Sequence, residues 1–232
     1  MTTIRYSPVT HVIFDLDGTL VDTEDIIHKI MSDIVTKTYE KEYPANIRHF
    51  TAGQTMVNTA NIVIKQCELN CDTIEFIAAV DLVARHYLSE CKLKPGAERL
   101  VKHFYMHDIP ICVATSSDME SVMLKSTNHR SLFSLFHHIT TAAKNPEVKY
   151  SKPEPDVFLV AASKFEEHPR PYKCLVFEDA YLGVLGGRRA GMQVVMIPDP
   201  SLPEDDTFMA TKVLPSMLYF EPEMFGLPSF EP

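Results

Sequence analysis

Two aspartates and a glycine follow the first apolar run of the chain, and their types and spacing could do chemistry. The run 11–14 is His-Val-Ile-Phe, and Asp15-Leu16-Asp17-Gly18 comes directly after it. Such a run is typical of a buried strand in a parallel sheet, where ligands bind beyond the carboxyl ends of the strands. Gly18 lets the chain turn, so both carboxylates can face one crevice. We therefore expect one carboxylate to attack an electrophile and the other to act as acid and then as base.

Two other interpretations of this stretch need weighing. A calcium-binding loop is excluded, because Gly18 is fourth rather than sixth from Asp15 and the twelfth position, which requires a bidentate glutamate, is Ile26. A purely structural interpretation, in which an aspartate caps the end of a strand, stays open from this stretch alone. Residues farther along the chain must decide between catalysis and capping.

Polar residues follow other apolar runs and could supply phosphate contacts. Thr115 and Ser116 come after the run 109–114, and their hydroxyl and backbone N–H groups could donate hydrogen bonds to phosphate oxygens. Lys152 lies in the Pro- and charge-rich loop 145–156. Its positive charge would neutralise a phosphoryl group and keep Asp15 ionised.

Acidic residues after a later run could complete a metal site. Glu178 and Asp179 follow the apolar run 174–177. Together with Asp15 and the backbone carbonyl of Asp17, they would form an oxygen-ligand site that suits Mg²⁺. Without a cation, four converging carboxylates would repel one another and raise their pKa values.

Each of these later residues, taken alone, has a simpler explanation. Lys152 could be a solvated loop lysine, Thr115 a turn residue, and the pair Glu178-Asp179 the cap of the next helix. The four anchors taken jointly and in this order are much more specific than any one of them. They favour phosphoryl transfer, which needs a nucleophile, charge neutralisation and positioning.

The elements that must position these residues alternate between strand and helix over most of the chain. Alternation of this kind predicts an α/β fold with a parallel sheet and right-handed crossovers, which gathers the polar strand ends on one edge. The expected strands are 10–14, 109–114, 138–141, 174–177 and 194–197, and the expected helices between them are 97–106, 119–125, 157–165 and 182–190.

Residues 24–92 carry helical patterns only. Apolar residues recur at helical spacing around 26–35, 54–68 and 72–91, and Lys94-Pro95-Gly96 ends the segment. We therefore predict a small all-helical domain at 24–92, inserted after the first strand, and a core formed by 1–23 and 93–232. The loop 51–54 between two helices is expected to close over the strand ends, with Gln54 and Asn58 as polar donors to the substrate.

Composition limits the classes of partner. The chain has 232 residues, 45% of them hydrophobic, and a net charge of -9. This charge argues against a nucleic-acid polymer or an anionic membrane surface as partner, and no apolar run approaches the length of a membrane helix. The five cysteines are odd in number and stand in apolar or helical text, so we expect reduced thiols. The expectation is a cytoplasmic monomer that binds a small molecule.

The order Asp15/Asp17, Thr115, Lys152, Glu178/Asp179 resembles the four motifs of the haloacid dehalogenase-like superfamily, and the helical insertion resembles its small-cap subgroup. The resemblance implies a Rossmann-like core with a mobile cap and a Mg²⁺-dependent phosphatase that forms an aspartyl-phosphate on Asp15. A dehalogenase is disfavoured, since it needs neither Asp17 nor a metal-binding acidic pair.

Within this superfamily, the sequence looks most like nucleotide phosphatases, and pseudouridine 5'-phosphate is the favoured phosphomonoester substrate. Alternatives stay open: a phosphatase or phosphomutase of another sugar or nucleotide phosphate, or a catalytically impaired binding paralogue. The last is kept because Ala142 to Asn145 and Ser151 depart from the pattern of the relatives.

Overall fold

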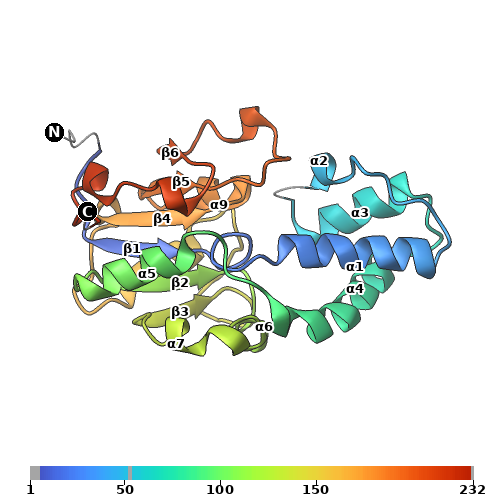
Figure 1. The fold of residues 1–232 in the computed structure, drawn as a ribbon, viewed down its shortest axis with the longest axis horizontal. Helices are drawn as coiled ribbons and strands as arrows, with labels where there is room; N and C mark the ends of the chain where they lie inside the picture. Colours follow the sequence, from blue (N-terminus) through green and yellow to red (C-terminus); the bar gives the residue numbers. More distant parts are fainter. Residues whose placement is uncertain (1–5, 52–53, 231–232) are drawn as a thin grey trace.

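The computed structural model describes residues 6–51 and 54–230, and a six-stranded parallel sheet forms its centre (Figure 1). The strand order is β3-β2-β1-β4-β5-β6, so the chain builds outward from β1 in one direction and then restarts at β4 on the other side. Ligands of such sheets bind at this switch point. The strands are β1 (His11–Phe14), β2 (Ile111–Thr115), β3 (His138–Thr141), β4 (Cys174–Glu178), β5 (Gln193–Met196) and β6 (Lys212–Val213).

Both faces of the sheet are covered, because successive side chains of each strand point to opposite faces. On β1, Val12 and Phe14 pack with α5 (Ala97–Met106) and α7 (Arg130–Phe133), and the ring of Phe14 stacks on Phe177 at 4.9 Å. Ile13 packs on the other face, with α8 (Asp156–Ser163) and α9 (Tyr181–Arg189). The apolar runs are therefore buried on both sides, which holds the strand ends in fixed positions.

A group of helices lies to one side of the sheet, at the right in Figure 1. Its members are α1 (Glu24–Lys37), α2 (Arg48–Thr51), α3 (Met56–Gln66), α4 (Thr73–Tyr87) and the 3-10 turn η1 (Leu88–Glu90). In the described part of 24–90 there is no strand. The two connections to the sheet run together, since Asp22 N–H donates to Lys92 O and Lys94 N–H to Leu20 O. The division into a core and a cap at 24–92 stays a prediction.

The predicted fold class is confirmed, and α5, α6 (Met119–Lys125) and β3 have the expected bounds. Three short elements were not predicted: α2, α7 and β6 contain two to four residues each, too few for an apolar period to develop. Remaining 3-10 turns are η2 (Thr127–His129), η3 (Pro171–Lys173), η4 (Glu204–Asp206), η5 (Met217–Tyr219) and η6 (Pro222–Phe225).

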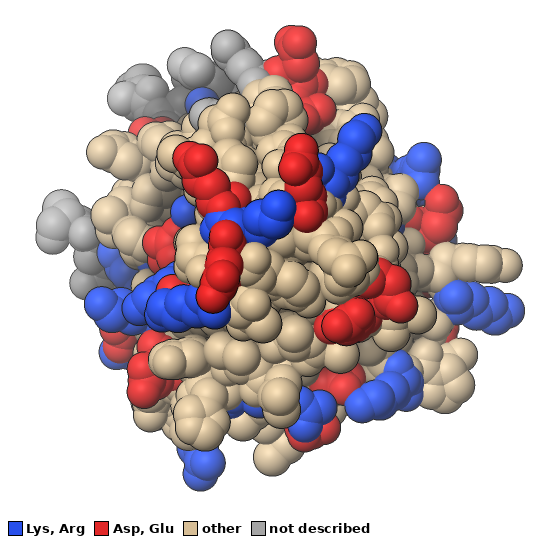
Figure 2. Space-filling model, turned by 90° about the vertical axis from the view of Figure 1, so that its right-hand side faces the viewer, with Lys and Arg blue, Asp and Glu red and all other residues tan. Residues whose placement is uncertain are grey.

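The outer surface of the helical group carries charges of both signs. Figure 2 shows acidic and basic side chains interspersed over this face, without a continuous basic area. A nucleic-acid polymer would require such a basic area. None of the described helices is both long enough and apolar enough to cross a membrane.

Candidate active site

The carboxyl ends of β1 and β4 bring three acidic residues together. The register pairs Phe14 with Phe177, so Asp15 and Glu178 leave neighbouring strands at the same level, and Asp15 N–H donates to Phe177 O at 2.9 Å. One carboxylate oxygen each of Asp15, Glu178 and Asp179 can be chosen so that all three lie within 4.8 Å of one another. The topology thus gathers three of the four predicted acids into one cluster.

Lys152 inserts its ammonium group into this carboxylate cluster. Its Nζ lies 2.5 Å from Asp15 Oδ1 and 2.7 Å from Glu178 Oε1, and its side chain is only 9% exposed. Burial acts to lower the pKa of Lys152, but the neighbouring carboxylates of Asp15 and Glu178 outweigh burial and raise it above its ordinary value. Lys152 is therefore a protonated, buried lysine rather than the solvated loop residue of the simpler explanation.

The cluster carries more negative charge than Lys152 can balance. Burial, followed by the charges of Glu178 and Asp15, raises the pKa of Asp179 well above its ordinary value. Burial also raises the pKa of Asp15, against the opposing effect of Lys152. Oxygen-only donors at this spacing, with an uncompensated negative charge, suit a hard divalent cation such as Mg²⁺. The residues present therefore fit the metal that the sequence implies.

Two glycines leave the space that the acidic side chains occupy. Gly18 has a left-handed backbone (φ +77°), and a Cβ at this position would collide with the Asp179 carboxylate. A Cβ at Gly183 would collide in the same way with the Glu178 carboxylate. The Gly of the D-x-D-G pattern is thus required both for the turn and for the close approach of Asp179.

Glu178 has a structural role in addition to its place in the cluster. Its Oε2 accepts the backbone N–H groups of Asp179 and Ala180, both at 2.9 Å, at the turn before α9. Its Oε1 faces Lys152. Glu178 thus fits both the interpretation as a helix cap and the interpretation as a site residue. It accepts the backbone N–H groups of the turn and also pairs with Lys152.

The carboxylate of Asp17 is held on the β2 side of the site, apart from the three-acid cluster. Its Oδ1 lies 2.6 Å from Lys125 Nζ, and its Oδ2 accepts the hydroxyl of Ser117 at 2.8 Å. Burial acts to raise the pKa of Asp17, but Lys125, Ser117 and Thr23 together lower it below its ordinary value. Its side chain is 31% exposed, so part of the carboxylate is accessible from solvent.

Thr115 and Ser116 stand at the end of β2, next to β1. Thr115 is buried, and its hydroxyl oxygen accepts the backbone N–H of Ser117 at 3.0 Å, which leaves the hydroxyl proton available to donate. Ser116 is exposed at the first position after the strand. The structure therefore places both on the same edge of the sheet as Asp15.

Gln54 and Asn58 lie exposed at the start of α3. Asn58 Nδ2 donates to Gln54 Oε1 at 3.3 Å, and Thr55 caps the helix by accepting the backbone N–H of Asn58. These contacts match the structural interpretation of polar residues at a helix start. Ala52 and Gly53 of the loop predicted to close over the site lie outside the described residues.

Three charged residues near the site were missed by the sequence analysis. Lys125 is buried beside Asp17, and its signal is its position three residues after the buried Val122, on the same face of α6. Burial and then Asp17 raise the pKa of Glu24, at the first turn of α1. Arg48 links the helical group to the loop after β5, because its guanidinium lies 2.5 Å from Asp25 and 2.6 Å from Asp199.

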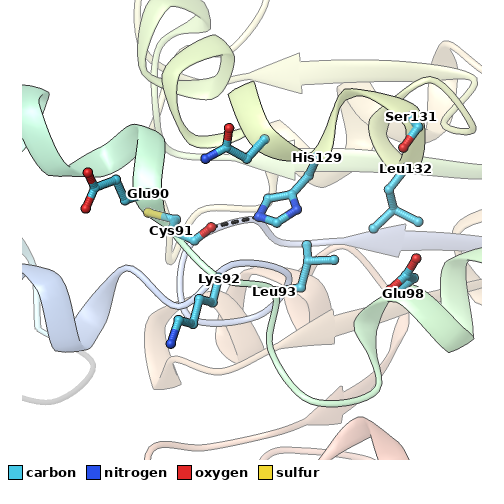
Figure 3. A pocket seen from close by; sticks show the side chains of 9 residues that line it. Glu90, Cys91, Lys92, Leu93, Glu98, His129, Ser131 and Leu132 are labelled. Carbon is cyan, nitrogen blue, oxygen red and sulfur yellow. Dashed lines mark hydrogen bonds between the residues drawn. The ribbon is translucent and has the colours of Figure 1, made fainter.

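A cavity of about 410 Å³ lies beside the chain segment that returns from the helical group (Figure 3). His129 Nε2 donates to the carbonyl of Cys91 at 2.7 Å, and both residues line the cavity. None of the predicted site residues lines this cavity, so it is separate from the candidate active site. Its lining residues are Glu90, Cys91, Lys92, Leu93, Glu98, Asn128, His129, Ser131 and Leu132.

Comparison with known proteins gives consistent matches. The profile of the haloacid dehalogenase-like hydrolases matches residues 12–197. A probable pseudouridine-5'-phosphatase of Drosophila melanogaster is 42% identical over 96% of each chain, and the (DL)-glycerol-3-phosphatase 2 of Arabidopsis thaliana is 38% identical over 96% of this chain and 93% of the relative. The crystal structure of a conserved haloacid dehalogenase-like protein of unknown function from Agrobacterium tumefaciens has a TM-score of 0.74 and 26% identity, covering 90% of this chain and 94% of the other.

Proposed function

This chain belongs to the haloacid dehalogenase-like hydrolase family, and we propose that it is a Mg²⁺-dependent phosphatase that hydrolyses pseudouridine 5'-phosphate through an aspartyl-phosphate. The Drosophila and Arabidopsis relatives carry phosphatase names, so it is a phosphoric monoester hydrolase acting on small phosphate substrates. The observation that carries the proposed covalent mechanism is the buried contact of Lys152 with Asp15 at the switch point of the sheet, and the proposed substrate rests on the similarity to the Drosophila relative.

In the first half of the proposed reaction, Asp15 attacks the phosphorus atom. A carboxylate oxygen of Asp15 forms the new O–P bond while the bond from phosphorus to the alcohol oxygen breaks. Lys152 offsets negative charge on the phosphoryl oxygens, and the hydroxyl of Thr115 and backbone N–H groups around Ser116 donate hydrogen bonds to them. Asp17 must enter this half protonated, against the effect of Lys125 on its pKa, and it gives this proton to the departing alcohol oxygen, so that the alcohol leaves neutral.

In the second half, water replaces Asp15 on phosphorus. Asp17, ionised after the first half, takes a proton from the water as its oxygen bonds to phosphorus. The bond between phosphorus and Asp15 breaks, which releases inorganic phosphate and restores the Asp15 carboxylate. The Lys125 and Ser117 contacts of Asp17 favour the ionised form that this half requires.

The metal would be held by Asp15, Asp179 and the backbone carbonyl of Asp17, with Glu178 contributing directly or through water. When bound, Mg²⁺ supplies positive charge to the phosphoryl oxygens. We expect saturating Mg²⁺ to raise the thermal midpoint of wild-type protein by roughly 5 °C, because it binds the folded state and offsets the buried carboxylates.

Asp179→Ala should remove most of this Mg²⁺-dependent shift. The variant loses one anionic ligand, and its metal-free form should be no less stable than wild type, since one buried charge is gone. Differential scanning calorimetry with Mg²⁺ and with EDTA measures both effects. Asp205→Ala, at an exposed aspartate, is the matched control and should keep the wild-type shift. An equal shift in Asp179→Ala would contradict the proposed metal site.

A phosphate-release assay tests the proposed function. The substrates are pseudouridine 5'-phosphate, uridine 5'-phosphate and glycerol 3-phosphate, each with Mg²⁺ and with EDTA. We expect the highest kcat/KM for pseudouridine 5'-phosphate and no turnover in EDTA. Glycerol 3-phosphate as the best substrate would favour a second candidate function, a glycerol-3-phosphatase, which the similarity to the Arabidopsis relative supports. Equal turnover of all three would leave a general phosphatase, and isomerisation without release would indicate a mutase.

We propose that substrate choice resides in the helical segment 24–92, acting as a cap over the core 1–23 and 93–232. Gln54→Ala should reduce the preference for pseudouridine 5'-phosphate over uridine 5'-phosphate by about tenfold, because hydrogen bonds to the alcohol part set discrimination. Asn58→Ala should act in the same direction. Hydrolysis of p-nitrophenyl phosphate is the internal control. An unchanged preference for pseudouridine 5'-phosphate would mean that Gln54 and Asn58 have only a structural role at the helix start. The cytoplasmic location and the monomeric state stay predictions.

A further inference from the structure

Lys125 is a buried lysine to which the mechanism above assigns only an effect on the ionisation of Asp17. It is the last residue of α6, and its side chain is 8% exposed. Its Nζ lies 2.6 Å from Asp17 Oδ1 and donates to Ser117 Oγ at 2.7 Å, while Ser117 Oγ donates to Asp17 Oδ2 at 2.8 Å. The three groups close a triangle in which both oxygens of the carboxylate are engaged.

A triangle of this kind restricts the orientation of the Asp17 carboxylate. Any rotation of the carboxylate breaks at least one charge-assisted hydrogen bond, and these are the strong ones. The hydroxyl of Thr23 also acts to lower the pKa of Asp17. A general acid must meet its proton acceptor at hydrogen-bond distance, so a fixed orientation of Asp17 has a direct effect on proton transfer.

Stability alone gives a poor explanation of this arrangement. Burying a lysine beside a carboxylate costs desolvation energy, and apolar residues of similar volume often serve a fold as well or better. The apolar neighbour Val122 on the same face of α6 shows that this face packs inward. Lys125 therefore stands where an aliphatic side chain would suit packing, and its ammonium group is aimed at Asp17.

We propose that Lys125 is a positioning residue, which together with Ser117 holds the Asp17 carboxylate in the orientation needed to protonate the leaving alcohol. The proposal rests on the proposed function of the same site. It assigns Lys125 no contact with the substrate. Its effect on the reaction passes entirely through Asp17.

The test compares substrates that differ in their need for a proton donor. An alkyl phosphate such as pseudouridine 5'-phosphate needs its leaving oxygen protonated, whereas p-nitrophenolate leaves without a proton. The kcat/KM value covers the steps up to cleavage of the ester bond. Lys125→Met should lower kcat/KM for the alkyl phosphate by about 30-fold and for p-nitrophenyl phosphate by less than about threefold.

A double-mutant cycle tests whether Lys125 acts through Asp17. Asp17→Asn should lower kcat/KM for the alkyl phosphate by about 10³-fold, and adding Lys125→Met should cause no further loss, because residues that act as a unit are not additive. Ser117→Ala, a smaller change, should give the same substrate pattern with a loss of about fivefold and keeps the test available if Lys125→Met folds poorly.

Lys144→Met is the matched control. Lys144 pairs with Asp118, the N-cap of the same helix, but its side chain is 75% exposed. It should leave both kcat/KM values unchanged. Equal losses on both substrates, or additive effects in the double variant, would overturn the positioning role while the phosphatase assignment stands. A wild-type protein without phosphatase activity would overturn the proposed function, and this inference with it.

Discussion

Asp15→Asn should lower phosphatase turnover by about 10⁴-fold or more. The amide keeps the size and shape of the side chain and can still accept a hydrogen bond from Lys152, but it is not an anionic nucleophile. We expect turnover to be lost without loss of stability, because Asp15 is buried and its replacement removes one charge from a crowded carboxylate cluster. Initial rates of phosphate release from pseudouridine 5'-phosphate measure the effect.

A covalent intermediate gives the same prediction a second measurement. Wild-type protein that is quenched in acid during turnover of a ³²P-labelled substrate should carry label, and Asp15→Asn should carry none. Asp33→Asn is the control, since Asp33 pairs with Lys37 on the surface of α1 and should keep both the rate and the label. Turnover of Asp15→Asn near the wild-type rate would exclude covalent catalysis at this residue. Circular dichroism should show an unchanged fold.

The three-acid cluster could be predicted because its members stand directly after apolar runs. In a parallel sheet, the ends of β1 and β4 meet on one edge regardless of how long the connections are, so Asp15, Glu178 and Asp179 had to come close. Lys152 could be assigned to the active site only because it comes between Thr115 and Glu178 in the order of the four motifs. Its loop has no apolar periodicity, and the composition of the loop alone would predict a solvated lysine.

The Asp17 contacts could not be predicted in the same way. Ser117 and Asp17 are 100 residues apart, and Lys125 reads as a lysine in the last turn of a helix, where a positive charge is favourable without any tertiary partner. Its partner depends on the angle at which α6 leaves β2. Side-chain contacts of this kind follow from tertiary packing rather than from local pattern.

The helical segment shows the same limit on the substrate side. Its three longer helices could be predicted from their apolar period, but Arg48 lies in a four-residue helix and reaches Asp199 in the loop after β5. Gln54 and Asn58 are exposed and bond to each other. If the segment acts as the proposed cap, which of these side chains would contact the substrate depends on its position relative to the sheet, and sequence pattern carries no information on that position.

Charge balance in the active site leads to the second large effect. Lys152 is the buried ammonium that contacts both Asp15 and Glu178, and its Nζ also lies 4.9 Å from the ring centre of Phe158. Removing one partner of a buried ion pair leaves the other charge uncompensated. Lys152→Met should therefore lower the free energy of unfolding of the metal-free protein by about 3–5 kcal/mol. Turnover should fall by about 10³-fold, since charge on the phosphoryl oxygens is no longer offset.

The pH dependence separates this explanation from a simple packing defect. Burial raises the pKa values of Asp15 and Asp179 in the folded state, so folding favours their protonated forms, and stability falls as the pH rises and these groups ionise. Without Lys152 the ionised forms are still less favourable. The stability difference between wild type and Lys152→Met should therefore be small near pH 5 and grow towards about pH 8.

Urea unfolding in EDTA across this pH range measures the difference. Lys164→Met is the control, because Lys164 pairs with Glu147 at 2.7 Å and the two side chains are 34% and 57% exposed, against 9% for Lys152. An exposed pair contributes roughly 0.2–1 kcal/mol, so the control should lose little stability at any pH. A loss in Lys152→Met that is constant between pH 5 and about pH 8 would mean that packing, and not uncompensated carboxylates, sets its cost. The growing loss that we expect would instead identify the excess negative charge at the strand ends as the reason why removal of Lys152 destabilises the protein.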